Sequence, residues 1–222
     1  MCGRFSFAIT EKFIEEHYGF SLPDYTPRYN CAPAQMLAVV TDHQPGGFSF
    51  LRWGFVPSWA KEISAGSTMI NAKAETVSTK PAFRKSLLTK RCLVPADSFY
   101  EWSQGSSKIP YRILLKNKPV FSMAGIWSEW QSPENIIISS FAIITTEANA
   151  MVGNIHNRMP VIFDNINTER SWLQNNSVEE LLSLLQPLDA EKMEMYQVSE
   201  KLNFPRNDFP GLHNHAETPG LF

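Results

Sequence analysis

The sequence predicts an α+β protein, built as a single β-rich domain with a strongly bent, mostly antiparallel sheet and a few peripheral helices. Three observations support this prediction. Runs of β-branched and aromatic residues outnumber the segments that carry helix signals. These runs do not alternate regularly with helices, as they would in a doubly wound parallel sheet. The chain has 222 residues, of which 43% are hydrophobic, enough to bury a sizeable core.

Three stretches carry the signals that begin and end helices. They are residues 11–18, between Thr10 and Gly19; residues 79–88, with Pro81 in the first turn; and residues 177–186, which open with the capping box Ser177-Val178-Glu179-Glu180 and precede Pro187. A capping side chain satisfies N–H groups that the first turn leaves unpaired, whereas glycine and proline end helices. We therefore expect three short helices.

Two pairs of β-rich runs indicate hairpins because turn-forming residues separate them. The pairs are Met36–Val40 with Phe48–Trp53, and Tyr111–Leu115 with Val120–Ala124. Two further runs, Ile136–Thr145 and Met159–Phe163, also predict strands.

Nothing in the sequence divides the chain into parts, so residues 1–222 are expected to form one domain. From about Asn203 the chain is rich in Pro, Asn, Gly and His, and we expect residues 204–222 to form a loose tail. No apolar run reaches the roughly 18 residues of a membrane span, and the first residues lack the apolar stretch of a secretory signal. A membrane or secreted role is therefore disfavoured.

Cysteine usage indicates a reducing compartment. The three cysteines, Cys2, Cys31 and Cys92, are an odd number with wide spacings, which suits free thiols in a cytoplasmic protein. They lack the spacing of zinc ligands, and the chain has no glycine-rich phosphate loop. The triplet His213-Asn214-His215 matches the letters of a nuclease motif, but it lies in the expected tail, without the strands and helix that would present metal ligands. We expect no metal and no cofactor.

Charge is distributed unevenly along the chain. Residues 1–130 carry 15 Lys and Arg against 10 Asp and Glu, whereas residues 131–222 carry 5 against 12. A polyanion is thus expected to meet the N-terminal part, although the net charge of −2 argues against strong non-specific binding of nucleic acid. A solvated surface with uneven charge explains the same numbers.

Cys2 is the first candidate for chemistry. Removal of Met1 would leave a cysteine with both a free α-amine and a thiol, whose ordinary pKa values are about 7.7–8.0 and 8.5. An amine attacks an aldehyde to give a Schiff base, and the thiol of the same residue can then close a five-membered thiazolidine. The alternative is a frayed terminus without a role.

Three other strings contain polar residues in unusual settings. Asn71, Lys73 and Glu75 stand at alternate positions and would share one face if the segment is extended. Glu101 stands among aromatic residues, where poor solvation would raise its pKa toward general acid-base use, and His156 precedes an apolar strand. The alternatives are a turn for Asn71, a surface ion pair for Glu101 and a satisfied buried polar group for His156.

Six ordered strings together resemble the SOS-response-associated peptidase (SRAP) family. They are Met1-Cys2-Gly3-Arg4-Phe5, Arg28-Tyr29-Asn30-Cys31-Ala32-Pro33, Trp53-Gly54-Phe55-Val56-Pro57-Ser58-Trp59, Asn71-Ala72-Lys73-Ala74-Glu75-Thr76, Phe99-Tyr100-Glu101-Trp102 and Ile155-His156-Asn157-Arg158-Met159-Pro160. Six motifs in order are far more specific than one short pattern. Lys73 departs from the family, which often has arginine there; lysine keeps the charge but loses the planar fork.

The resemblance implies a sensor of abasic sites in single-stranded DNA that crosslinks itself to the ring-opened sugar through its N-terminal cysteine. Cys2 would be the nucleophile, and Asn71 would hold its amine or the thiazolidine. Glu101 would move protons during ring opening and ring closure, and His156 would protonate the aldehyde oxygen. The peptidase of the family name would then be the removal of Met1, with no general peptidase activity. We expect a monomer that acts on single strands, or at their junction with duplex, and that associates with the nucleoid when bound to DNA.

Cations and aromatic side chains in or near these strings are the expected DNA contacts. They are Arg4, Arg28, Arg52, Phe55, Trp59, Lys73, Arg84, Lys85 and Arg158. The cations would hold phosphates without reading bases, and the aromatic rings would stack on bases. For Phe55, packing in the core is the alternative.

Two other functions remain open at this point. An N-terminal-nucleophile cysteine amidohydrolase would use the α-amine of Cys2 as base and turn over small amides. A module that binds single-stranded DNA without covalent chemistry would bind equally well after Cys2→Ala.

Overall fold

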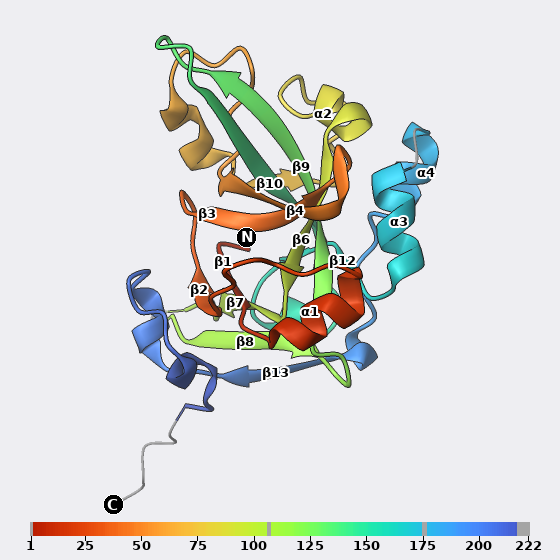
Figure 1. Ribbon diagram of the computed structural model, residues 1–222. Helices are drawn as coiled ribbons and strands as arrows, with labels where there is room; N and C mark the ends of the chain where they lie inside the picture. Colours follow the sequence, from red (N-terminus) through yellow and green to blue (C-terminus); the bar gives the residue numbers. More distant parts are fainter. Residues whose placement is uncertain (1, 106–107, 175–176, 217–222) are drawn as a thin grey trace, which may run out of the picture.

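The computed structural model describes residues 2–105, 108–174 and 177–216, whose strands form two sheets with helices packed outside them (Figure 1). The first sheet has the strand order β13-β8-β7-β1-β2, and all its neighbouring pairs are antiparallel. Its strands are β1 (Arg4–Phe7), β2 (Arg28–Cys31), β7 (Ser98–Trp102), β8 (Pro110–Leu115) and β13 (Met193–Gln197).

The second sheet closes on itself. Its path runs β11-β10-β4-β3-β6-β9-β12, and β9 also pairs with β10, so the strands from β10 to β9 form a ring. The strands are β3 (Met36–Thr41), β4 (Gln44–Trp53), β6 (Arg91–Ala96), β9 (Phe121–Gln131), β10 (Ile137–Glu147), β11 (Arg158–Pro160) and β12 (Ile162–Phe163), with β5 (Asn71–Lys73) beside β10. Only the pairs of β10 with β4 and with β5 are parallel among the described strands. The predicted β-rich α+β class with a strongly bent, mostly antiparallel sheet is confirmed.

Buried aromatic side chains join the two sheets. Phe5 of β1 contacts Trp53 of β4, with ring centroids 5.2 Å apart, and Trp53 stacks on Phe141 of β10 at 6.2 Å. All three rings are almost fully buried, and burial of each stabilises the fold by about 1.5–3 kcal/mol. The core therefore holds β1, and with it the start of the chain, against the closed sheet.

The helices are short. They are α1 (Glu11–Tyr18), α2 (Arg84–Thr89), α3 (Ile166–Gln174) and α4 (Val178–Ser183), with 3₁₀ turns η1 (Ile63–Thr68), η2 (Val152–Asn154), η3 (Ala190–Lys192), η4 (Glu200–Asn203) and η5 (Pro210–His213). Within the described parts of the chain, no helix has the length and apolar character needed to cross a membrane.

The predicted helix signals are correct at two of three places. Gly19 takes a φ of 80° and ends α1, although the Thr10 side chain makes no capping hydrogen bond, and the Ser177 side chain accepts from the N–H of Glu180 at the start of α4. The helix predicted over residues 79–88 instead begins at Arg84. Before it the chain forms turns, in which the N–H groups of Thr79 and Lys80 bond to the carbonyl of Thr76. Helix α3 is missing from the sequence prediction.

The hairpin predicted from Tyr111–Leu115 and Val120–Ala124 is wrong. The first segment lies in β8, which pairs with β7 and β13, whereas the second contributes to β9, which pairs with β6, β10 and β12. The turn between them carries the chain from one sheet to the other. Almost all of β9 is buried, which suits a strand with neighbours on both sides. The hairpin of β3 with β4 forms as predicted.

Residues 204–216 are packed, in contrast to the expected loose tail. The carboxylate of Asp208 accepts hydrogen bonds from the N–H groups of Tyr29 and Asn30, at 2.6 and 3.2 Å, and Leu212 is fully buried. The N–H of Ala216 bonds to the carbonyl of Gln197 at 2.8 Å. Composition alone suggests a polar tail, but these polar groups satisfy the backbone of β2 and its neighbours. The remaining residues of the expected tail, 217–222, lie outside the described part.

Candidate active site around the N-terminal cysteine

The start of the chain lies near the middle of the molecule, between β1 and the strands β3 and β4 (Figure 1). β1 pairs with β7 so that Arg4 is opposite Tyr100, and the residues before β1 therefore run beside the end of β7. Cys2 is fully buried within the same core cluster as Phe5 and Trp53. Its Sγ lies 3.8 Å from the carbonyl oxygen of Arg4. The N-terminal cysteine is thus held by the core, which is at odds with the frayed alternative.

Asn71 holds the main chain of Cys2. It is the first residue of β5, which the parallel pairing with β10 places opposite Ile143. Its Nδ2 donates a hydrogen bond of 2.9 Å to the carbonyl of Cys2. Its Oδ1 is buried and has no hydrogen-bond partner among the described residues. A buried acceptor without a partner is costly unless a ligand group satisfies it.

Glu101 is a buried carboxylate beside Cys2. It lies in β7 and is only 3% exposed, and burial raises its pKa to about 7. Burial, and next the negative charge of Glu101, raise the pKa of the Cys2 thiol far above its ordinary value. At neutral pH the Glu101 carboxyl is therefore shared between its two protonation states, and the thiol keeps its proton.

His156 lies between η2 and β11 with one ring nitrogen fixed. Its Nδ1 lies 3.0 Å from the backbone nitrogen of Arg158 and 3.2 Å from the carbonyl oxygen of the same residue, so the backbone of Arg158 holds this nitrogen as acceptor or as donor. Burial, more than nearby positive charge, lowers the pKa of His156 below its ordinary value. His156 is therefore a neutral hydrogen-bond donor near neutral pH.

One pocket joins Glu101 to His156. It has a volume of about 510 Å³. Its lining residues are Glu101, Trp102, Ser103, Gln104, Gly105, Lys108, His156 and Asn203. The hydrogen bond between Asn71 and Cys2, the electrostatic effect of Glu101 on the Cys2 thiol, and the pocket shared by Glu101 and His156 link all four residues expected for catalysis. Three elements remote in sequence, β5, β7 and the segment before β11, meet there at the start of the chain.

Three pocket residues, Trp102, Lys108 and Asn203, are not individual candidates in the sequence analysis. Trp102 donates from its indole nitrogen to Oδ1 of Asn203 at 2.7 Å, so the two side chains form one wall. Lys108 lines the same pocket and is exposed. The aromatic string before Trp102 is a signal for the first, whereas no sequence pattern marks Asn203 or Lys108.

Two of the arginines expected at DNA already bind carboxylates. Arg28 donates from Nε to Asp208 at 2.6 Å and from Nη2 to Gln35 at 2.8 Å. Arg158 makes two hydrogen bonds to Glu75, of 2.6 and 2.9 Å. Both guanidinium groups are thus already paired with a carboxylate. Phosphate binding by either stays a prediction.

Arg4 and Arg52 are half-buried near the start of the chain. Arg4 donates to the carbonyl of Gly3 at 3.1 Å, and burial lowers its pKa. Its Nε, like Nη1 of Arg52, is buried without a hydrogen-bond partner in the described structure. Both atoms are buried from solvent, and phosphate binding by either arginine stays a prediction.

The remaining cations are exposed. Lys73 ends β5, two residues beyond Asn71, while Arg84 and Lys85 lie on α2. Lys85 borders a pocket of about 140 Å³ together with Trp59, whose side chain is 67% exposed. An exposed tryptophan beside a lysine has the composition of a stacking site for single-stranded nucleic acid.

Phe55 does not meet the expectation that it stacks on bases. It is 1% exposed and packs edge to face against Phe83, with ring centroids 5.3 Å apart. The core alternative applies, because the chain beyond the end of β4 at Trp53 turns this side chain against Phe83, the residue before α2.

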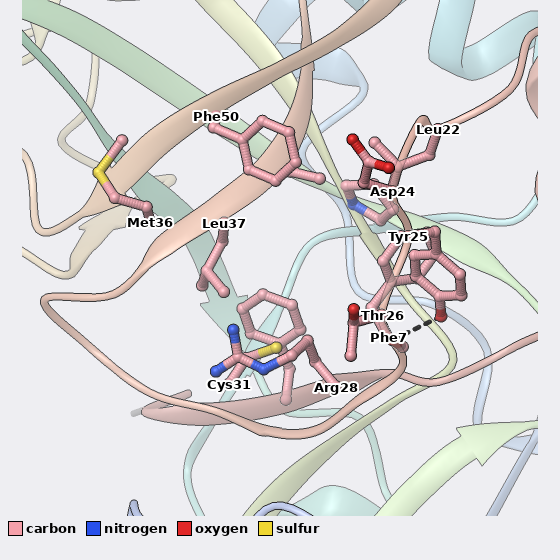
Figure 2. Close-up of a pocket in the computed structure, with 13 residues that line it drawn as sticks. Phe7, Leu22, Asp24, Tyr25, Thr26, Arg28, Cys31, Met36, Leu37 and Phe50 are labelled. Atoms are coloured by element: carbon pink, nitrogen blue, oxygen red, sulfur yellow. Dashed lines mark hydrogen bonds between the residues drawn. The ribbon is translucent and has the colours of Figure 1, made fainter.

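A third pocket, with a mostly apolar lining, lies beside β1 and β2. Figure 2 shows its lining, with Phe7, Tyr25 and Cys31 on one side and Met36, Leu37 and Phe50 on the other. It has a volume of about 220 Å³ and includes none of the four residues expected for catalysis.

These observations define a class: a β-rich α+β protein in which a buried cysteine near the start of the chain is linked to an asparagine and a glutamate, with a histidine across a pocket from that glutamate. Comparison with known proteins gives the family. The family model described as SOS response associated peptidase (SRAP) matches residues 1–205, and the chain belongs to this family.

Named relatives and a solved structure support the assignment. The chain is 46% identical over 221 residues to "Abasic site processing protein YoqW" of Bacillus subtilis, covering 96% of this chain and 98% of that protein. It is 33% identical to "Abasic site processing protein HMCES" of Gallus gallus, over 84% of this chain and 65% of that protein. A crystal structure of a protein from Bacteroides thetaiotaomicron has a TM-score of 0.87 at 29% identity, covering 97% of this chain and all of the other.

Proposed function

We propose that the protein captures abasic sites in single-stranded DNA as a covalent thiazolidine on Cys2, after removal of Met1. The observation that supports the proposal is that Asn71 bonds to the buried Cys2, that Glu101 acts electrostatically on its thiol, and that His156 shares a pocket with Glu101. Two relatives are named abasic site processing proteins, which supports the same substrate. The adduct shields a lesion that would otherwise break the strand.

Ring opening is the first step. An abasic sugar is mostly a closed hemiacetal, so a proton must leave the anomeric hydroxyl and another must reach the ring oxygen. Glu101, with a pKa of about 7, is suited to move protons in both directions near neutral pH. His156 protonates the aldehyde oxygen afterwards, as the Schiff base forms, and does so from Nε2 when Nδ1 accepts the N–H of Arg158.

The α-amine of Cys2 then attacks the aldehyde carbon. A C–N bond forms, the carbonyl oxygen leaves as water, and a Schiff base results. Asn71 orients this step through its hydrogen bond to the Cys2 carbonyl, and its buried Oδ1 accepts an N–H of the amine. Positioning of two reactants in this way lowers the entropic part of the barrier.

Addition of the thiol closes the ring. The Sγ of Cys2 bonds to the same carbon, the C=N double bond becomes single, and the thiol proton ends on the nitrogen. The first bond uses the amine alone. The thiol can therefore stay buried and protonated until the Schiff base has formed and only the ring-closing bond remains to be made. Glu101 lies near enough to raise the pKa of the Cys2 thiol, so its carboxylate is well placed to accept the thiol proton.

DNA binding requires few contacts and no base recognition. Lys73, Lys85 and Trp59 are exposed, and their chemistry suits phosphates and unstacked bases. We propose that a monomer engages a single strand, or its junction with duplex, with weak sequence preference.

The decisive experiment mixes the purified protein with a single-stranded oligonucleotide that contains one abasic site. Mass spectrometry first confirms loss of Met1. A denaturing gel should then show a shifted band with the wild-type protein and none with Cys2→Ala. Borohydride should restore a band with Cys2→Ala, because this variant keeps the α-amine and reduction traps the Schiff base.

Two results would reject the proposal. One is the absence of a denaturant-stable band when Met1 has been removed. The other is an undiminished band with Cys2→Ala in the absence of borohydride. Turnover of small amides without capture would instead indicate an amidohydrolase, and intact binding by Cys2→Ala with no wild-type adduct would indicate a non-covalent module.

A further inference from the structure

Arg158 is enclosed by hydrogen-bond acceptors. Nη1 and Nη2 bond to the two oxygens of Glu75 at 2.6 and 2.9 Å, and Nη2 also donates to the carbonyl of Thr145 at 2.6 Å. The Arg158 side chain is only 11% exposed, whereas that of Glu75 is 46% exposed. The hydrogen bonds from Arg158 lower the pKa of Glu75, so the carboxylate stays charged. Glu75 is thus the solvent-exposed member of this ion pair, and Arg158 is the buried one.

A carboxylate and a phosphate bind the same edge of a guanidinium. Both accept two parallel N–H bonds from the planar fork. A phosphate cannot bind Arg158 through Nη1 and Nη2 while Glu75 occupies them. The exposure of the Glu75 side chain leaves it a path to swing outward, whereas Thr145 fixes Arg158 in place.

The pair lies close to the residues proposed for capture. Arg158 pins Nδ1 of His156 through its backbone N–H, and Glu75 follows Lys73 by two residues. In the β10–β11 register Arg158 is opposite Glu147, which adds a second exposed carboxylate to this edge.

We propose that Glu75 is a specificity-determining residue that occupies the fork of Arg158 in the DNA-free protein and must be displaced by a DNA phosphate. The proposal rests on the proposed function, since it concerns the DNA that reaches that site. Displacement costs the Glu75–Arg158 bonds and leaves a carboxylate near the strand. Intact single strands therefore bind weakly and leave, whereas a strand with an abasic site is retained by its covalent bond.

The test measures binding of a fluorescently labelled, intact thymidine oligonucleotide at low salt by anisotropy. Glu75→Gln should bind about fivefold more tightly than wild type, because a partly exposed ion pair no longer competes. Glu75→Asp keeps the charge but is one methylene too short to reach both nitrogens, so it should fall between the two. Glu16→Gln removes the same charge from an exposed Lys12–Glu16 pair on α1 and should leave affinity unchanged.

Thermal unfolding confirms that each variant is folded, and Glu75→Asp carries the test if Glu75→Gln is not. Equal or weaker binding by Glu75→Gln overturns the proposal. Tighter binding of the oligonucleotide by Glu75→Gln, with unchanged binding by Glu75→Asp, also overturns the proposal, since the effect is then one of net charge. Capture of an abasic strand is measured with the same proteins, and failure of wild type there rejects the proposed function instead.

Discussion

The side-chain amide of Asn71 donates a hydrogen bond of 2.9 Å to the main-chain carbonyl of Cys2. The two residues are 69 positions apart, and the bond exists because β5 lies beside β10 in the closed sheet while β1 belongs to the other sheet. It joins the two sheets at the point where the proposed reaction takes place.

The first prediction concerns this bond. Asn71→Ala should slow capture of an abasic strand about tenfold, because a hydrogen bond worth about 1.4 kcal/mol no longer orients Cys2. Asn71→Asp should also be slow, since it lacks the donating N–H. Single-turnover capture rates measure the effect, and affinity for intact strands serves as the control. Wild-type rates in both variants would show that the bond is only structural.

The second prediction concerns pH and Glu101. Because the folded-state pKa of Glu101 is raised to about 7, the ionised carboxylate that accepts protons is lost as the pH falls through 7. The capture rate of the wild type should therefore decline below this pH. Glu101→Gln should be slower and lack that decline, which leaves only the titration of the amine.

Glu16→Gln provides the matched control for Glu101→Gln, since it removes a carboxylate that is exposed and distant in sequence from the site. A Glu101→Gln profile that keeps the decline near pH 7 would assign the titration to another group. Loss of binding to intact strands in Glu101→Gln would indicate a structural role.

The third prediction concerns Asp208 and the last described residues. Asp208→Ala should lower the free energy of unfolding by about 2–3 kcal/mol, because the N–H groups of Tyr29 and Asn30 and the guanidinium of Arg28 lose their acceptor. Limited proteolysis should then cut the segment after residue 204. Unchanged stability and protease resistance would contradict the packing of this segment.

The fourth prediction concerns acid stability and His213. Burial, followed by the charge of Arg112, lowers the pKa of His213 to about 3, whereas the unfolded chain binds a proton near pH 6.5. The unfolded state is therefore favoured as the pH falls below 6.5. This one group should cost about 2 kcal/mol at pH 5.

His213→Gln should show a smaller loss of stability between pH 7 and pH 5. Denaturant unfolding at the two pH values measures the difference. Equal pH dependence in the wild type and His213→Gln would mean that the imidazole is protonated without cost in the folded protein.

Local elements could be read from the sequence because their signals act between near neighbours. Gly19 ends α1 through its own backbone conformation, and the β3–β4 hairpin needs only a short turn between two apolar runs. The sequence predicts the strand β8 correctly but pairs it with the wrong segment, because pairing depends on segments far along the chain.

The motifs around Cys2, Asn71, Glu101 and His156 pointed to the chemistry, since an amino-thiol, an amide, a carboxylate and an imidazole have that reactivity in any fold. Their meeting is a property of the tertiary structure, as are the pKa of Glu101 and the backbone contacts that hold Nδ1 of His156. Likewise, only the packed structure buries Phe55 and couples Arg158 to Glu75. Burial and ion pairing are set by the neighbours that distant segments bring together, and a linear sequence does not contain those distances.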